Sequence, residues 1–87
     1  MARYHVAAQH TKEQCLADLD QMAAKPKVLE KFEWGCMAGD HTGYALLEAG
    51  SEQEARSMLP AEMRGRAQII EVSTITPEQI QSFHQQM

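Results

Sequence analysis

The spacing of apolar residues alternates along this chain between the two-residue period of a β-strand and the roughly 3.6-residue period of an α-helix. The pattern predicts strands over residues 3–9, 28–37, 43–49 and 67–74. Helices are predicted from Thr11 to about Ala24, from Ser51 towards Pro60, and briefly after Thr76. The order strand, helix, strand, strand, helix, strand leaves few ways for 87 residues to form one core.

Each predicted helix begins at a capping sequence. Thr11–Gln14 and Ser51–Glu54 are capping boxes, in which a hydroxyl and a second polar side chain satisfy free N–H groups of the first turn. Thr76 precedes Pro77, and proline is common in a first helical turn. Pro60 falls where the second long helix must end or restart, and the pattern does not define the connector that follows it.

The element order is that of a ferredoxin-like, split β-α-β fold. Because crossovers between parallel strands are right-handed, we expect one antiparallel sheet with strand order 4-1-3-2. Both long helices then cover one face, and only the short last helix is left to cover the other. We therefore expect residues 1–87 to form a single α+β domain.

The charge and the apolar content of the chain limit the kinds of partner that such a domain can bind. The formal net charge is −4 and the basic residues are scattered, which argues against nucleic acid as the main partner. No apolar run approaches the roughly 18 residues that a membrane span needs, and the N-terminus lacks the apolar core of a signal peptide. These features predict a cytoplasmic protein, in which Cys15 and Cys36 stay reduced.

The uncovered face of the sheet predicts a homodimer. A chain of this size buries only about 60–65% of its unfolded surface, so a lone core is marginal. Strand parity assigns the apolar residues to two faces. The helix side is expected to hold Tyr4, Val6, Ala8, Ala45, Leu47, Ala49, Ile70 and Val72. The uncovered face is expected to hold Phe32, Trp34, Leu46 and Ile69, which a second subunit would bury.

The strand plan, together with the stretches Phe32–Cys36 and Thr42–Ala49, resembles small bacterial members of unknown function in the dimeric α+β barrel superfamily. There a ferredoxin-like subunit pairs sheet to sheet with a copy of itself, so the resemblance implies a cavity between the two sheets. Members include cofactor-free monooxygenases, lactone isomerases, haem-handling enzymes and small nickel-binding proteins. The fold alone therefore does not assign a function.

Ionisable residues on the uncovered face form the first candidate site. His5 and Glu71 are expected on adjacent strands, with Tyr44 and Glu48 on the next strand. A histidine flanked by carboxylates inside a cavity could act as a general base. We thus predict catalytic roles for His5, Tyr44 and Glu48, and ligand contacts from Phe32, Trp34, Tyr44 and Glu71. The alternative is that the carboxylates lie in water at the rim and His5 is paired structurally.

A second candidate site surrounds the turn between the second and third strands. Cys36 and His41 offer a thiolate and an imidazole across a tight turn, which suits a divalent transition metal. Zinc needs three or four protein ligands, so the others would come from the partner chain or from His5, His10 or His84. The alternative is that Cys36 is a small buried hydrophobe and His41 an exposed turn residue. Cys15 lies on the apolar stripe of the first helix, where a core role is expected.

Three functions follow from these patterns. The first is a homodimer that binds a small ligand or a divalent metal between its sheets. The second is a cofactor-free isomerase or monooxygenase in which His5 transfers a proton. The third is a structural or interaction dimer whose sheets touch directly. The paired aromatic and polar residues favour the binding function, because ligand pockets combine apolar walls with a few convergent polar groups.

Overall fold

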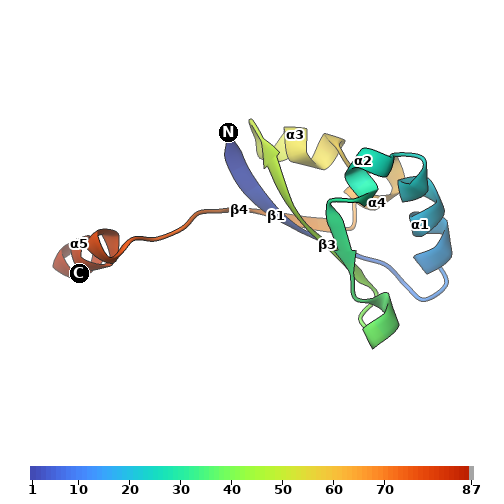
Figure 1. The fold of residues 1–87 in the computed structure, drawn as a ribbon, viewed down its shortest axis with the longest axis horizontal. Helices are drawn as coiled ribbons and strands as arrows, with labels where there is room; N and C mark the ends of the chain where they lie inside the picture. Colours follow the sequence, from blue (N-terminus) through green and yellow to red (C-terminus); the bar gives the residue numbers. More distant parts are fainter. Residues whose placement is uncertain (87) are drawn as a thin grey trace.

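A computed structural model, which describes residues 1–86, has an α+β fold built on one four-stranded antiparallel sheet (Figure 1). The strands are β1 (Ala2–Gln9), β2 (Phe32–Trp34), β3 (Thr42–Ala49) and β4 (Ala67–Val72). Their order across the sheet is β2-β3-β1-β4, which is β4-β1-β3-β2 from the other edge. All three neighbouring pairs are antiparallel.

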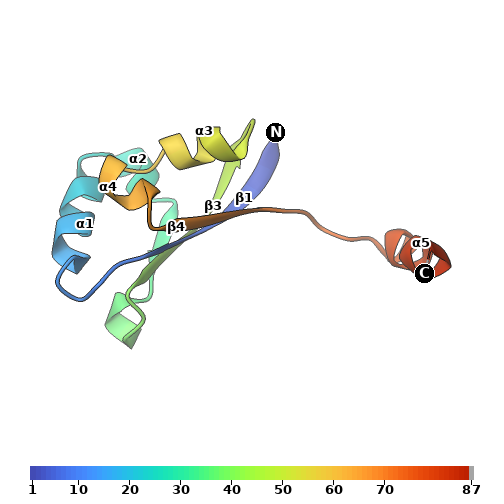
Figure 2. The ribbon, with the colours of Figure 1, turned by 180° about the vertical axis from the view of Figure 1, so that it is seen from behind.

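The helices are α1 (Cys15–Ala23), α2 (Pro26–Leu29), α3 (Glu52–Ser57), α4 (Ala61–Arg64) and α5 (Pro77–Gln86), and η1 (Cys36–Ala38) is a single 3₁₀ turn. In Figures 1 and 2, α1 to α4 lie along one side of the sheet, while α5 stands apart at the end of an extended segment. Within residues 1–86, no helix has the length and apolar character needed to cross a membrane.

The hydrogen bonds of the predicted capping sequences are present, although α1 begins only at Cys15, one turn after Thr11, with Gln14 as its N-cap. The Gln14 N–H donates to the Thr11 hydroxyl at 3.2 Å, and the Thr11 N–H donates to the Gln14 side chain at 2.9 Å. The Glu54 N–H donates to the Ser51 hydroxyl at 3.1 Å. The same reciprocal pattern joins Thr76 and Gln79. These local interactions fix where the chain turns from strand to helix.

The central strands β1 and β3 form the middle of the core. Val6, Leu47 and Ala49 are fully buried. They pack with Met22, Leu59 and Met63 from the helical layer, so the apolar side of each helix meets the same face of the sheet. The predicted parity of these two strands is therefore confirmed, because burial alternates along both of them as the side chains of a strand alternate between its two faces.

The predicted parity of the two edge strands is wrong. The register pairs Phe32 with Ala45 and Val6 with Ile69, so Phe32 and Ile69 face the helices and are buried. Ile70 is on the open face and is 63% exposed. Two successive isoleucines carry no alternation of their own, so only pairing with β1 decides which one points inward.

The second strand is shorter than predicted. Residues 28 and 29 belong to α2, because Pro26 starts a helical turn that the apolar run continues. The strand then ends at Trp34, and Cys36 opens the η1 turn instead of extending it.

The sequence left α5 as the one helix that could cover the open face of the sheet. In the structure α5 does not cover that face. Its apolar residues Ile80 and Phe83 are about half exposed, and no residue of the helix is buried. The open face itself presents Tyr44, Leu46 and Ile70 to solvent. Both surfaces are therefore uncovered in the single chain.

Adjacent leucines on β3 offer a direct test of this two-faced sheet. Leu47 is fully buried and Leu46 is 50% exposed. We expect Leu47→Ala to lower the free energy of unfolding by about 2–5 kcal/mol, because it leaves a cavity in the core. Leu46→Ala should lower it by less than about 1 kcal/mol. Urea denaturation of dilute protein measures both, and equal losses would contradict the assigned faces.

Candidate metal centre

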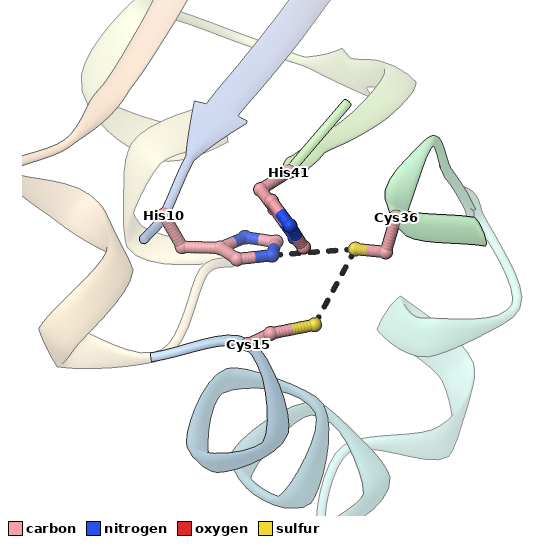
Figure 3. Close-up of side chains that lie close together, drawn as sticks. All are labelled: His10, Cys15, Cys36 and His41. Atoms are coloured by element: carbon pink, nitrogen blue, oxygen red, sulfur yellow. Dashed lines mark hydrogen bonds between the residues drawn. The ribbon is translucent and has the colours of Figure 1, made fainter. Parts of the chain in front are cut away.

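Four potential metal ligands meet at one end of the sheet. The ligand atoms of His10, Cys15, Cys36 and His41 all lie within 4.8 Å of one another. Figure 3 shows the two thiols and the two imidazoles pointing toward a common centre. The prediction that Cys36 and His41 come together is confirmed, and His10, one of the histidines considered, supplies a third group.

The two histidines are placed by the pairing of β1 with β3. The last pair of the register is Gln9 with Thr42. The His10 N–H then donates to the His41 carbonyl at 3.0 Å, which extends the pairing by one residue on each strand. His10 continues the inward parity of Val6 and Ala8 and is buried. The imidazole rings meet edge to face with centroids 5.6 Å apart.

Each cysteine is brought back to the histidines by a tight turn. The hydrogen bonds between Thr11 and Gln14 close a turn after His10, and α1 begins directly behind that turn at Cys15. On the other side, the η1 turn returns Cys36 towards His41. Gly39 has a left-handed φ of 91°, and a side chain at Gly35 would meet the Asp40 carbonyl at 2.8 Å. Glycine is therefore required at both positions of this turn.

The distances inside the cluster suit a small tetrahedral ion. The Cys36 sulfur lies 3.5 Å from the Cys15 sulfur and 3.3 Å from Nε2 of His10. Ligand atoms about 2.3 Å (S) and 2.0–2.1 Å (N) from a tetrahedral zinc are themselves about 3.3–3.8 Å apart. These two edges already have that length. The widest pair, within 4.8 Å, needs side-chain movement of about 1 Å to reach it.

A buried ion pair lies behind the His10 ring. Nδ1 of His10 lies 3.7 Å from the Asp18 carboxylate, and both side chains are almost fully buried. The Arg66 guanidinium holds that carboxylate with two hydrogen bonds of 2.8 and 2.9 Å. With Nδ1 directed at Asp18, Nε2 is left to face the thiols. Carboxylates in this position behind a histidine commonly orient metal ligands.

Burial sets the protonation of the cluster. It lowers the pKa of His10, although Asp18 opposes the shift, and so favours the neutral ring, whose nitrogen lone pair can bind a metal. Burial and the neighbouring Cys15 raise the pKa of the Cys36 thiol. A bound cation would reverse this second effect, because a coordinating thiol is deprotonated outright.

Nδ1 of His41 is one of three buried nitrogens without a hydrogen-bond partner in residues 1–86, together with Nδ1 of His10 and Nε1 of Trp34. Buried polar atoms are nearly always satisfied, and an ion is one of the usual reasons when they are not. The orphaned His41 nitrogen therefore fits the donor set of a metal site.

Asp40 supports the turn but is not a ligand. Its carboxylate accepts hydrogen bonds from the Tyr44 and Thr42 hydroxyls, and these bonds lower the pKa of Asp40. The Tyr44 phenol has its pKa raised by the same contact. Both carboxylate oxygens are thus engaged next to His41. Met37, also in the turn, is fully exposed and away from the cluster.

A cleft of about 580 Å³ opens beside the two histidines. It is lined by Gln9, His10, Thr11, Gln14, Asp40, His41, Thr42 and Arg66. The cluster is therefore not sealed inside the core, and an ion has a polar path to it.

Part of the catalytic set predicted for the open face comes together. The rings of His5 and Tyr44 have centroids 6.2 Å apart. Both line a second cleft of about 300 Å³, together with Lys31 and Glu33. Glu48 lies further along the same face, opposite Arg3. The catalytic roles of His5, Tyr44 and Glu48 stay predictions.

Three of the residues predicted to contact a ligand on the open face do not lie on that face beside His5. Phe32 and Trp34 stack on each other on the helix side, with centroids 5.6 Å apart, so they do not line a cavity on the open face. Glu71 lies opposite Tyr4, on the side of the sheet away from His5. After burial, Glu71 is the next cause of the raised pKa of Tyr4. The error has one origin, the wrong parity of β2 and β4.

Cys15 was assigned to the core, yet it is partly exposed and lies in the cluster. On α1 the buried positions are Asp18 and Met22, while Leu16 is 70% exposed. The sequence does contain a signal for this arrangement. Cys15 follows His10 by five residues, and Cys36 precedes His41 by five residues. Because β1 and β3 pair antiparallel, the two His/Cys pairs lie at the same end of the sheet.

Comparison of the chain with protein-family models, with curated proteins and with solved structures finds no match in any of the three. The resemblance to the dimeric α+β barrel superfamily therefore stays a prediction.

The ion pair behind His10 has a measurable energetic role. We expect Arg66→Met to lower the free energy of unfolding by about 3 kcal/mol, because it leaves the buried Asp18 carboxylate without its partner. Arg3→Met is the matched control and should change it by less than about 1 kcal/mol. Urea denaturation in the presence of a chelator separates this effect from metal binding, and an unchanged midpoint for Arg66→Met would contradict it.

Proposed function

We propose that this chain is a metal-binding domain of ferredoxin-like topology, whose ion is held by His10, Cys15, Cys36 and His41. One observation carries the proposal: four donor atoms of the right chemistry lie within 4.8 Å of one another. The strand order and the helices on one side of the sheet support the ferredoxin-like assignment. The metal belongs to the helix side at the end of the sheet, and not to a cavity between paired sheets.

The donor set favours zinc. Two thiolates and two imidazoles form an S₂N₂ set, which is typical of tetrahedral zinc. Calcium and magnesium prefer oxygen ligands, and the nearby Asp40 carboxylate is already engaged by two hydroxyl groups. Four protein ligands complete the coordination of zinc and leave no open position for a substrate. The function supported is therefore to hold the ion and not to use it as a Lewis acid.

The ion would tie together segments that are distant in the sequence. Residues His10 and Cys15 flank the β1–α1 turn, and Cys36 and His41 flank the η1 turn. Binding energy of this kind becomes folding energy when the site exists only in the folded chain. A domain of 87 residues has a small core to rely on. We infer that the metal fixes the end of the sheet where both turns meet.

The chain contains its own controls for a metal titration. Two of its four histidines lie in the cluster, and His5 and His84 lie outside it. We expect one zinc or cobalt ion per chain, with thiolate-to-cobalt charge transfer and the intense visible bands of a tetrahedral complex. His41→Ala or Cys36→Ser should weaken binding by at least about tenfold. His5→Ala and His84→Ala should leave it unchanged.

Equilibrium titration against a chromophoric chelator gives the affinity, and circular dichroism checks the fold of each variant. Failure of the natural chain to bind zinc, or equal weakening by His5→Ala and His41→Ala, would overturn the proposal.

We also infer that a second copy of the chain covers the open face of the sheet. Tyr44, Leu46 and Ile70 form an exposed apolar surface there, and contiguous exposed apolar patches commonly mark interaction sites. This set differs from the one expected from the sequence, because Phe32, Trp34 and Ile69 lie in the core. The exposed apolar residues of α5 would add to such an interface.

The pairing is tested by light scattering of the natural chain and one double variant. We expect a dimer that Leu46→Glu with Ile70→Glu converts to a monomer, because charges are costly to bury without partners. Leu16→Glu is the matched control, since Leu16 is 70% exposed on α1 and away from the open face. A natural chain that is monomeric at micromolar concentration would contradict the dimer.

A further inference from the structure

The two cysteines of the metal centre lie close enough to react with each other. Their sulfur atoms are 3.5 Å apart, and neither is in a disulfide. Both side chains are partly exposed. They are also the only cysteines of the chain, so no other thiol competes for either of them. A disulfide needs a sulfur separation of about 2.05 Å, which requires the thiols to approach by about 1.5 Å.

We propose that Cys15 and Cys36 form a redox-sensitive pair, which hydrogen peroxide oxidises to an intramolecular disulfide with loss of the bound metal. The loss of metal rests on the function proposed above. The formation of the disulfide does not, because it follows from the position of the two thiols relative to each other.

The reaction balances without any further reagent. One cysteine sulfur attacks a peroxide oxygen, the O–O bond breaks, and a sulfenic acid and one water form. The second sulfur then attacks the sulfenic sulfur and expels a second water as the S–S bond forms. The sulfur pair loses two electrons and peroxide gains them. In the zinc-bound chain the two protons required come from solvent and the two Zn–S bonds break.

The disulfide removes half of the ligand set. A thiolate binds zinc through its negative charge and lone pairs, and a disulfide sulfur has lost that charge. Only His10 and His41 would remain, and zinc sites in proteins use three or four protein ligands. The cleft beside the two histidines gives the released ion a path to solvent.

The surrounding structure favours this pairing over oxidation of each thiol alone. Cys15 is the first residue of α1 and Cys36 the first residue of η1, so each is held by the start of a helical turn. Each thiol has the other as its nearest thiol neighbour. A second thiol this close reacts with a sulfenic acid before the acid is oxidised further.

The first experiment uses the 87-residue chain prepared without metal. Treatment with stoichiometric hydrogen peroxide, followed by peptide mapping, should give a Cys15–Cys36 cross-link, a mass loss of two hydrogen atoms and no free thiol. A reductant should restore both thiols. Cys15→Ser is the control and should give no intramolecular cross-link. Sulfinic acids or intermolecular disulfides as the main products would overturn the proposal.

The second experiment uses the zinc-loaded chain and a chromophoric chelator. Peroxide should release one zinc ion for each disulfide formed, and reductant should restore zinc binding to its original stoichiometry. A disulfide that forms while zinc stays bound would overturn the loss of metal. Zinc binding without any disulfide would overturn this inference and leave the proposed function standing. A disulfide in a chain that never bound zinc would support the thiol pair and overturn the metal-binding function.

Discussion

The antiparallel pairing of β1 with β3 is the interaction on which the rest of the structure depends. Its register sets which residues of the two central strands face the helices, and so defines the core around Val6 and Leu47. The same register, continued one step past Gln9 and Thr42, brings His10 opposite His41. A slip of one residue would turn every side chain to the other face. The core and the candidate metal centre therefore both depend on one pairing.

Asp18 links the core to the metal centre. It is a carboxylate buried on α1, bound by Arg66 from the turn before β4, and it lies 3.7 Å from Nδ1 of His10. Replacing a buried ion pair with apolar residues often costs little stability, so stability alone gives no strong reason to keep the charge there. Its place behind the His10 ring suggests such a reason, because carboxylates in this position commonly orient histidines that bind a metal.

Local signals in the sequence were sufficient for the helix starts and the central strands. Thr11, Ser51 and Thr76 each make the capping bonds that their neighbours predict. The edge strands were not predictable in the same way, because β2 has three residues and β4 carries adjacent isoleucines. Their faces are decided by partners on other strands. The predicted walls Phe32 and Trp34, and the contact Glu71, failed for this reason.

The metal centre was half predictable, and the reason lies in its geometry. Cys36 and His41 flank one turn, so a local pattern reveals them, whereas Cys15 comes near them only through tertiary structure. Parity places His10 on the helix side of the sheet, away from Tyr44, Leu46 and Ile70 on the open face. A second copy covering that face would leave both metal centres outside the interface. The proposed metal binding and the proposed pairing of the chains therefore use separate parts of the fold and can be tested independently.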